Sequence, residues 1–332
     1  MAKSMRAAVY ERTGPAHEVL ALTELPLPEP AAGEVRVRLG WSGVNPSDVK
    51  SRAGTRTKTL PFPRIVPHSN GAGLIDAVGP GVDAGRVGER VWVWNAAWGR
   101  AFGTAAEYVV LPAVQAVMLP DEAPLEVGAC LGIPALTAYH AVHVDGGVAG
   151  RNVLVQGGAG AVGHYAIQFA RIAGAARVIA TVSSEQKARL AREAGADDTL
   201  NYKDGDWTAR CLDLTEGIGV DRIVEVDFAA NVGADLAVLR PEGDIVVYGS
   251  GAPEVAVPFV PAIVKGARMR WFIVYNLTAV VRDRAVAELT RLLAAGALRH
   301  NIAAHLPLSR IAEAHELVER GALIGNVVIS VV

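Results

Sequence analysis

A glycine-rich turn between a short apolar segment and a helical pattern constrains the fold of this chain more than any other feature. The stretch is NVLVQGGAGAVGHYAIQFARIAGA, residues 152–175. Its GxGxxG motif is formed by Gly158, Ala159, Gly160, Ala161, Val162 and Gly163. In a strand–turn–helix unit, such glycines let the backbone approach a pyrophosphate, which then meets the N–H groups of the helix N-terminus. The alternative is a turn that only needs flexible residues, but the flanking strand and helix favour a dinucleotide site.

Strand and helix patterns alternate on both sides of this turn. The strand patterns are short and almost wholly apolar, and a helix pattern over 183–195 ends on a glycine. This alternation is typical of a parallel sheet covered by helices on both faces. We therefore predict an α/β fold class, with a Rossmann doubly wound parallel-sheet domain over residues 126–297. Its predicted strands are 152–156, 177–182, 198–201, 222–227, 244–248 and 269–275.

The first 125 residues have a different pattern, in which short strands are separated by Gly and Pro. Residues 34–44, for example, alternate apolar and polar positions as a half-exposed strand does. Strands at this spacing without long helices predict a β-rich, partly closed barrel. After the Rossmann pattern come a charged helix at 278–295, a short strand, a helix at 309–321 and a closing strand, NVVISVV. We predict that this tail, 298–332, completes the first domain.

Composition excludes several classes of function. The net charge is −2 and no Lys/Arg-rich run is present, so nothing predicts nucleic-acid binding. No window offers about 20 uninterrupted apolar residues, and the first residues lack a signal-peptide core, so no membrane association is expected. The two cysteines, Cys130 and Cys211, are too few for a disulfide framework and suit a reducing compartment. We predict a cytoplasmic protein.

The end of the second Rossmann strand indicates which dinucleotide binds. An NAD site usually places Asp or Glu there, where it bonds the ribose 2′-hydroxyl and would repel a 2′-phosphate. Here the strand ends in Ser183 and Ser184, with Lys187 one helical turn later. Hydroxyls and an ammonium suit a phosphate, which favours NADPH, and Glu185 is expected to point to solvent. The alternative is that Ser183 caps the helix and Lys187 is simply solvated.

Segments along the whole chain carry a resemblance to a known family. They include GVNPSDVKSRAG (43–54), GAGLIDAVGPGV (71–82), GIPALTAYHAV, VLVQGGAGAVG and GNVVISVV. On these segments the sequence resembles the medium-chain dehydrogenase/reductase superfamily, in its zinc-free quinone oxidoreductase (zeta-crystallin-like) branch. The resemblance implies a GroES-like catalytic domain over 1–125, completed by 298–332, and a Rossmann domain. It also implies an active site in the cleft between the two.

The zinc positions of the superfamily can be compared residue by residue. Zinc-dependent relatives have a Cys where this chain has Val44-Asn45-Pro46, and a Gly-His-Glu before Gly-Ala-Gly. Aligned on the glycines, Ser69 and Asn70 stand in the His and Glu places, and His68 falls one position early. A tetrahedral site needs three or four well-placed ligands, and the structural-zinc lobe needs four clustered cysteines. We predict no metal, with His68 as a loop histidine.

The resemblance also suggests which residues act on the substrate. Asn45, in the GVNP turn, would face the nicotinamide and the substrate, although an asparagine beside a proline can serve the turn alone. Many relatives have Tyr where this chain has Lys50, which would either donate a hydrogen bond to a carbonyl oxygen or be solvated. Asp48 is expected to brace the loop rather than to transfer protons. No residue spacing favours nucleophilic catalysis.

Further cofactor contacts are implied by the resemblance alone. Thr137 would approach the nicotinamide carboxamide, and Tyr202 would lie against the adenine and the 2′-phosphate. The ribose and nicotinamide would be lined by Asn231, by Val247, Gly249 and Ser250, and by Phe272 and Val274. Relatives usually have Gly-Lys before the last strand, so Asn326 makes that contact without a charge. The aromatic residues Trp92, Trp94, Trp98 and Phe102 either wall the substrate site or pack as ordinary core.

Together these features predict an NADPH-dependent, metal-free reductase that transfers hydride to a quinone. An α,β-unsaturated carbonyl or enoyl substrate is the second alternative, and an aldehyde or ketone is the third. A protein that binds NADPH with little turnover is the alternative from another class. The apolar last strand of the Rossmann sheet predicts a homodimer joined along that edge.

Overall fold

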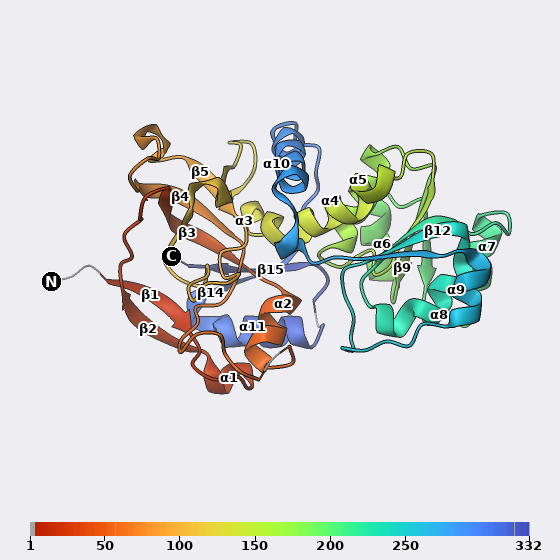
Figure 1. Cartoon of the computed structure of the whole chain (residues 1–332), viewed down its shortest axis with the longest axis horizontal. Helices are drawn as coiled ribbons and strands as arrows, with labels where there is room; N and C mark the ends of the chain where they lie inside the picture. The colour runs from red at the N-terminus through yellow and green to blue at the C-terminus, as the bar shows by residue number, and fades with distance from the viewer. Residues whose placement is uncertain (1–3, 57, 322, 332) are drawn as a thin grey trace. The chain divides into compact units, whose positions relative to one another are not determined.

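The computed structural model describes residues 4–56, 58–321 and 323–331 (Figure 1). The chain forms two compact units, one made of Met1–Ile133 with Val286–Val332 and the other of Pro134–Ala285. The sequence patterns had suggested boundaries at 125/126 and 297/298. The helix α10 (Ala279–Ala294) crosses the second boundary between the units. Each unit is described separately below.

A mostly antiparallel sheet organises the first unit. Its strands follow the order β14-β15-β3-β4-β5-β7, and β6 also pairs with β3. The late strand β15 lies between β14, to which it is parallel, and β3, to which it is antiparallel. Residues 326–330 therefore complete a sheet that begins at residue 34. The bounds are β3 Glu34–Val44, β4 Gly71–Val78, β5 Arg90–Val93, β6 Tyr108–Pro112, β7 Ala116–Met118, β14 Ile302–Pro307 and β15 Asn326–Ser330, with β1 Ser4–Val9 and β2 Ala21–Pro26 forming a separate pair.

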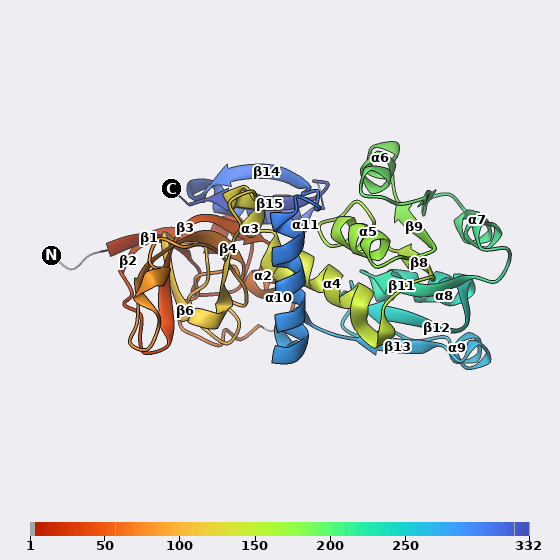
Figure 2. The ribbon, with the colours of Figure 1, turned by 90° about the horizontal axis from the view of Figure 1, so that it is seen from above.

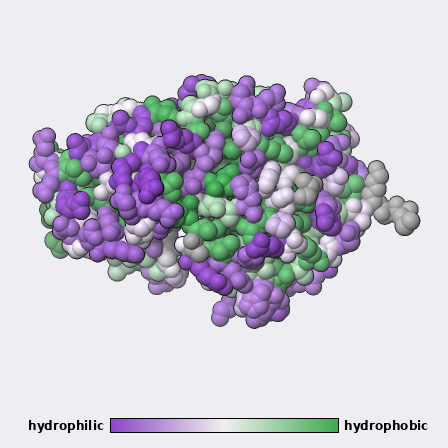
Figure 3. Space-filling view, turned by 180° about the vertical axis from the view of Figure 1, so that it is seen from behind, coloured by the Kyte–Doolittle hydropathy of each residue, from purple (hydrophilic) through white to green (hydrophobic). Residues whose placement is uncertain are grey.

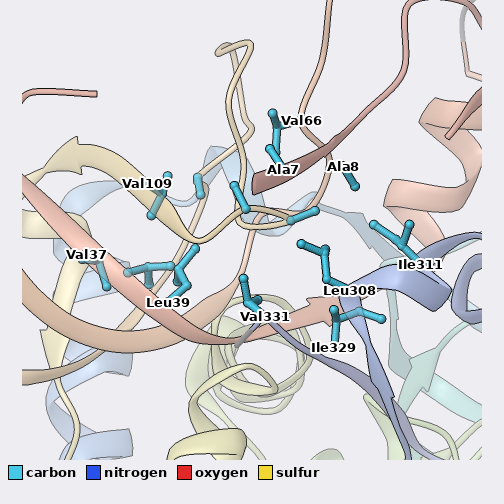
Figure 4. Close-up of a cluster of buried hydrophobic side chains, with 14 of the residues drawn as sticks. Ala7, Ala8, Val37, Leu39, Val66, Val109, Leu308, Ile311, Ile329 and Val331 are labelled. Carbon is cyan, nitrogen blue, oxygen red and sulfur yellow. The ribbon is translucent and has the colours of Figure 1, made fainter. Parts of the chain in front are cut away.

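Short helices flank this sheet. The α-helices are α1 Ala16–Val19, α2 Pro46–Ala53, α3 Leu125–Gly128 and α11 Ile311–Glu319, and the 3₁₀ turns are η1 Ala84–Arg86, η2 Ala113–Gln115 and η6 Leu308–Arg310. Helix α11 packs against both α1 and α2. Figure 4 shows part of the core, where Val37 and Leu39 of β3, Val109 of β6 and Ile329 of β15 gather with Ile311 of α11. Burial of these alternate strand positions holds the C-terminal segment to the N-terminal sheet.

The second unit contains a six-stranded parallel sheet in the order β10-β9-β8-β11-β12-β13 (Figure 2). The chain starts at the centre in β8, moves outward to β10, and returns beside β8 as β11. This confirms the predicted doubly wound sheet, whose ligands bind where the strand order reverses. The strands are β8 Asn152–Val155, β9 Arg177–Val182, β10 Asp198–Asn201, β11 Val220–Glu225, β12 Leu239–Val247 and β13 Arg268–Trp271.

Helices connect these strands. The connecting helices are α5 Gly163–Ile172, α6 Glu185–Glu193, α7 Trp207–Leu214, α8 Phe228–Val238 and α9 Phe259–Lys265. The segments η3 Leu131–Ala135, α4 Leu136–His143 and η4 Val144–Gly146 precede β8, and η5 Val274–Asn276 follows β13. Helix α5 packs beside α4 and α6, whereas α8 packs beside α7 and α9. The predicted last strand was too long, because β13 ends at Trp271 and the chain then turns into η5.

The surface is mixed in polarity. On the face shown in Figure 3, hydrophilic residues (purple) and hydrophobic residues (green) are interspersed. This agrees with a chain that has 32 Lys and Arg residues against 34 Asp and Glu residues. Among the helices of the described residues, none has the length and apolar character needed to cross a bilayer.

Candidate functional site

The glycine turn follows β8 directly and opens α5. Its left-handed residue is Gly157, with φ +66°, which precedes the predicted motif. A Cβ on Gly158 would lie 2.6 Å from the Cβ of Ala180, and one on Gly163 would lie 2.3 Å from the carbonyl oxygen of Gly157. Glycine is therefore required for the turn at 157 and for helix–strand packing at 158 and 163. The doubled glycine in QGG was the signal for Gly157 that the motif search missed.

The end of β9 carries a small polar cluster. The Lys187 ammonium donates a hydrogen bond to Ser183 Oγ at 2.9 Å. The N-cap of α6 is Ser184, whose Oγ accepts from the Lys187 backbone N–H, so the alternative role considered for Ser183 belongs to its neighbour. The Glu185 side chain is 74% exposed and pairs with Arg192. The cluster thus presents a hydroxyl and an ammonium, while the neighbouring Glu185 carboxylate pairs with Arg192.

Tyr202 lies beside this cluster. Its backbone N–H donates to the carbonyl of Val182 at 3.0 Å, which places it next to Ser183. Its side chain is exposed. The structure therefore brings together Ser183, Lys187 and Tyr202, the three residues expected near the adenosine 2′ position.

The carboxyl ends of β11 and β12 hold further predicted contacts. Asn231 on α8 donates from its amide to Glu225 Oε1 at 3.0 Å. After β12, the carbonyl of Gly249 accepts from the backbone N–H of Phe228 at 3.1 Å, and Ser250 Oγ donates to the Ala252 carbonyl at 2.7 Å. A Cβ on Gly249 would lie 2.1 Å from the Val226 carbonyl oxygen, so the two turns touch backbone to backbone.

Residues after β13 pack against α4. The Phe272 backbone N–H donates to the carbonyl of Val247 at 3.1 Å, and its ring meets His140 edge-on, with centroids 4.5 Å apart. Thr137 is buried one helical turn before His140, and Val274 is buried in η5. Burial lowers the pKa of His140 to about 4, so this ring is neutral near pH 7. Phe272 thus packs against α4 at His140, one helical turn after Thr137.

Asn45 is a buried residue of the first unit at the N-cap of α2. Its amide nitrogen donates to Asn70 Oδ1 at 2.6 Å and to Asp48 Oδ2 at 3.2 Å. Asp48 Oδ2 also accepts from the Asn45 backbone N–H at 2.8 Å, as in a capping box. Burial raises the pKa of Asp48 to about 7, against the opposing effect of the Asn45 hydrogen bonds. The asparagine is therefore held in one orientation, and Asp48 braces the turn.

The other two predicted residues of this unit lie elsewhere. Lys50 is half-buried on α2, and its backbone carbonyl accepts from Thr55. Asn326 is buried at the start of β15, where its amide donates to the Asn301 carbonyl at 3.0 Å. That bond ties β15 to the residue before β14 and gives Asn326 a structural contact inside the unit.

Ser69 and Asn70, which stand in the His and Glu places of zinc-dependent relatives, are buried next to His68. His68 is fully buried, with φ +77°, and its Nε2 lies 2.9 Å from Nε2 of His315. The loop assignment was right, but the ring is part of the core and not of the surface. Burial lowers the pKa of His68 to about 3, which keeps it neutral. Among the described residues, no three His, Cys, Asp or Glu side chains are grouped as metal ligands.

The four aromatic residues expected either at a substrate wall or in the core divide into two pairs. Trp92 and Trp94 are buried, whereas Trp98 and Phe102 are 43% and 51% exposed. Of these four residues, only Trp98 and Phe102 expose enough of their side chains to contact a ligand.

Comparison with known proteins adds to this geometry. The family model described as alcohol dehydrogenase GroES-like domain matches residues 31–121, and that described as zinc-binding dehydrogenase matches 161–294. A quinone oxidoreductase from Pongo abelii is 31% identical over 96% of this chain and 95% of its own length. A crystal structure of an NAD-dependent alcohol dehydrogenase is 33% identical, covers 99% of this chain and 100% of its own, and superposes with a TM-score of 0.90. The mycobacterial protein Rv1454c complexed with NADPH is 30% identical with the same coverage and a TM-score of 0.87.

Proposed function

Because the chain belongs to the medium-chain dehydrogenase/reductase superfamily, in its quinone oxidoreductase-like family, we propose that it transfers hydride from NADPH to a quinone without a metal ion. It is an NAD(P)H-dependent oxidoreductase, and its acceptor is a small molecule. The balanced reaction takes one NADPH, one quinone and one proton to NADP⁺ and the hydroquinone.

The observation that carries the choice of NADPH is the hydrogen bond between Lys187 and Ser183 at the end of β9. A 2′-phosphate is dianionic and gains charge-assisted hydrogen bonds from an ammonium and a hydroxyl. The relative solved with NADPH supports this choice, whereas the structure named as NAD-dependent makes NADH the comparison that any test must include. The Glu185 carboxylate does not oppose binding of a 2′-phosphate, since it pairs with Arg192.

We propose that Asn45 stabilises the oxyanion that develops on the quinone as hydride arrives. Its amide hydrogens are directed to Asn70 and Asp48, so a hydrogen bond to the substrate replaces one of these rather than adding to them. A donor already held in place loses little freedom when charge develops beside it. Lys50 is a second proposed donor to the acceptor oxygen. In this proposal hydrogen-bond donors take the place of a metal ion, because the Val44-Asn45-Pro46 turn, Ser69 and Asn70 stand where zinc-dependent relatives have Cys, His and Glu.

Two further features of the protein belong to the same proposal. The thiols Cys130 and Cys211 are free and buried, and burial raises the pKa of both, which fits a reducing cytoplasm. We also propose a homodimer that pairs along β13, the last strand of its sheet, beside which α9 exposes Phe259, Val260, Ile263 and Val264.

The deciding experiment is NADPH oxidation by purified protein with 1,4-benzoquinone, 9,10-phenanthrenequinone, an enone and an aldehyde, each with and without a chelator. We expect chelator-insensitive turnover of the quinones. The variant Asn45→Ala is expected to lower kcat by about a hundredfold while the Kd for NADPH changes little. If only the enone or the aldehyde is turned over, the assignment of a quinone as acceptor is wrong. If the chelator abolishes activity, the metal-free assignment is wrong. NADPH binding without any turnover would identify a binding protein.

A further inference from the structure

Four buried polar side chains lie beneath the glycine turn, at the carboxyl ends of three neighbouring strands. Gln156 directly follows β8, Thr181 is in β9, and Glu225 ends β11, while Asp235 approaches from α8. All four are at most 2% exposed. Buried polar groups are costly unless they are paired, so the way in which these four satisfy one another indicates what they do.

One end of this group holds the glycine turn. The backbone N–H of Gly157 donates to Thr181 Oγ1 at 2.9 Å, and the Thr181 hydroxyl donates to Gln156 Oε1 at 2.6 Å. Because its oxygen is occupied by Thr181, Gln156 directs its amide hydrogens the other way, and Nε2 donates to Asp235 Oδ1 at 2.7 Å. The left-handed residue of the turn is thereby connected to a carboxyl group on α8.

The other end holds the turn after β11. Glu225 Oε1 accepts from the backbone N–H of Asp227 and from the Asn231 amide. Its second oxygen, Oε2, lies 3.2 Å from the same Asn231 amide nitrogen. Glu225 therefore behaves as a carboxylate surrounded by donors. Because the Asn231 amide nitrogen is hydrogen-bonded to Glu225, the Oδ1 atom of Asn231 is the one suited to accept a hydrogen bond from a ribose hydroxyl.

Asp235 differs from Glu225 in this respect. Its Oδ2 is buried and receives no hydrogen bond from any nitrogen or hydroxyl donor of the described residues. Asp235 and Glu225 are nevertheless close enough to hydrogen-bond to each other. Two carboxylates at that distance would repel each other in a low-dielectric interior, whereas one proton between them satisfies the buried oxygen and removes the repulsion.

We propose that Glu225 and Asp235 share a single proton, carried on Asp235 and donated to Glu225, and that this acid–carboxylate pair positions both the glycine turn and Asn231 for the dinucleotide. The two are positioning residues, because they act through Gln156, Thr181 and Asn231 rather than by touching the cofactor. The inference rests on the proposed function only in taking a nicotinamide dinucleotide as the ligand.

The electrostatic surroundings agree with one shared proton. Burial, and then the charge of Glu225, raise the pKa of Asp235 well above the ordinary range of a carboxyl group. The other groups that act on the pair are Asp227, in the turn after β11, and Tyr248, just after β12. The first is an acid and the second a phenol whose own pKa is raised by burial, so neither supplies a compensating positive charge. Retaining the proton keeps one negative charge, and not two, beneath a turn that binds phosphates.

The experiment uses three variants of the full chain. Asp235→Asn keeps the shape and both hydrogen bonds, since its amide donates to Glu225 and its oxygen accepts from Gln156, but it has no proton to share. Asp235→Leu breaks both bonds. Asp198→Asn is the matched control, because it removes a partly exposed carboxylate that pairs with Arg177 at the far edge of the same sheet.

Two readouts need no electron acceptor. By infrared spectroscopy in an Asp48→Asn background, which removes the buried Asp48 carboxyl group whose pKa is also raised, the protonated-carboxyl band is expected to disappear when Asp235→Asn is added and to persist when Asp198→Asn is added. By titration, Asp235→Leu is expected to raise the Kd for NADPH at least about tenfold, and Asp235→Asn to recover most of that loss. The wild-type Kd should rise at alkaline pH, where the second negative charge forms, and Asp235→Asn should lack that rise.

The outcomes separate this inference from the proposed function. A protonated-carboxyl band that survives Asp235→Asn in the Asp48→Asn background overturns the shared proton even if Asp235→Leu does not fold. Wild-type NADPH affinity in a folded Asp235→Leu overturns the positioning role. If quinone turnover is absent but the variants shift NADPH binding as expected, the inference holds and the assigned reaction fails.

Discussion

At the scale of single residues, the site depends on side chains whose orientation is set by their neighbours. Lys187 is directed to Ser183, and Asn45 is held between Asp48 and Asn70. Such constraints remove the conformational freedom that a long or polar side chain would otherwise lose on binding. Substitutions here are therefore expected to have specific effects, on cofactor preference at Lys187 and on the pH dependence of stability at Asp48.

Replacing Lys187 tests the cofactor preference. Lys187→Ala is expected to raise the Kd for NADPH about tenfold or more and to leave the Kd for NADH nearly unchanged, because only NADPH has the 2′-phosphate that the ammonium would bind. Arg189→Ala is the control, since two residues along α6 place it on a different face of the helix. Fluorescence titration with both cofactors makes the measurement. Equal losses for the two would contradict a phosphate-binding role.

Asp48 should make stability depend on pH. Burial raises its pKa from 3.8 to about 7, so between these values the folded protein holds a proton that the unfolded chain has released. The stability contributed by Asp48 is therefore complete below about pH 4 and is lost as the pH rises through 7, by at most about 1.4 kcal/mol per pH unit. Urea unfolding from pH 4 to 8 should show that the free energy of unfolding of the wild type falls, as the pH rises, relative to that of Asp48→Asn. A difference that does not change with pH would refute the raised pKa.

At the scale of elements, the strand–turn–helix unit from β8 to α5 decides whether a dinucleotide can bind. Close packing at Gly158 and Gly163 brings the N-terminus of α5 near the end of β8. The free N–H groups of that helix end then face the position where a phosphate would lie. Any change that moves α5 away from the strand should weaken binding without touching the ligand.

A graded pair of glycine substitutions tests this packing. In Gly163→Ala the new Cβ would lie 2.3 Å from the Gly157 carbonyl oxygen, whereas in Gly160→Ala it would lie 3.2 Å from the same atom. We expect Gly163→Ala to destabilise the protein by about 1–3 kcal/mol and to weaken NADPH binding strongly. Gly160→Ala should have a smaller effect on both stability and NADPH binding. Thermal unfolding and NADPH titration provide the readouts. The reverse order of effects would show that α5 is not held by this contact.

The sequence predicted elements better than it predicted contacts. The bounds of β9 and β10 were correct, and for β9 the reason is that its apolar run ends at Ser183 and Ser184. The predicted β13 was too long because apolar residues continue into η5. The pairing of Asp235 with Gln156 joins residues 79 positions apart, and that of His68 with His315 joins residues 247 apart. No local pattern records such pairs. Periodicity reports which face of an element is buried, not which buried groups meet.

At the scale of the whole molecule, the second unit has a sheet edge with exposed apolar side chains beside it. Strand β13 ends its sheet, and Trp271 and the apolar side chains of α9 are exposed beside it. An edge strand with apolar neighbours is a surface on which another copy can pair.

Sedimentation velocity at micromolar concentration tests the proposed homodimer. The wild type is expected to sediment as a dimer, and Ile263→Asp as a monomer, because a charge on α9 would be buried in the interface. Val280→Asp provides the control, since Val280 is 81% exposed on α10. A monomeric wild type, or an Ile263→Asp variant that stays dimeric, would reject this surface.

The position of β15 has a consequence for how the protein is made. A ribosome releases residues in order, so β3 emerges long before β15, the strand that lies beside it in the finished sheet, and before β14, which pairs with β15. Residues 134–285, by contrast, form a continuous unit and can mature while the rest is still being translated. The first unit to begin is therefore the last to be completed. Until then, residues 41–44 of β3, which pair with β15 in the finished sheet, present an open edge to which chaperones or neighbouring nascent chains can bind.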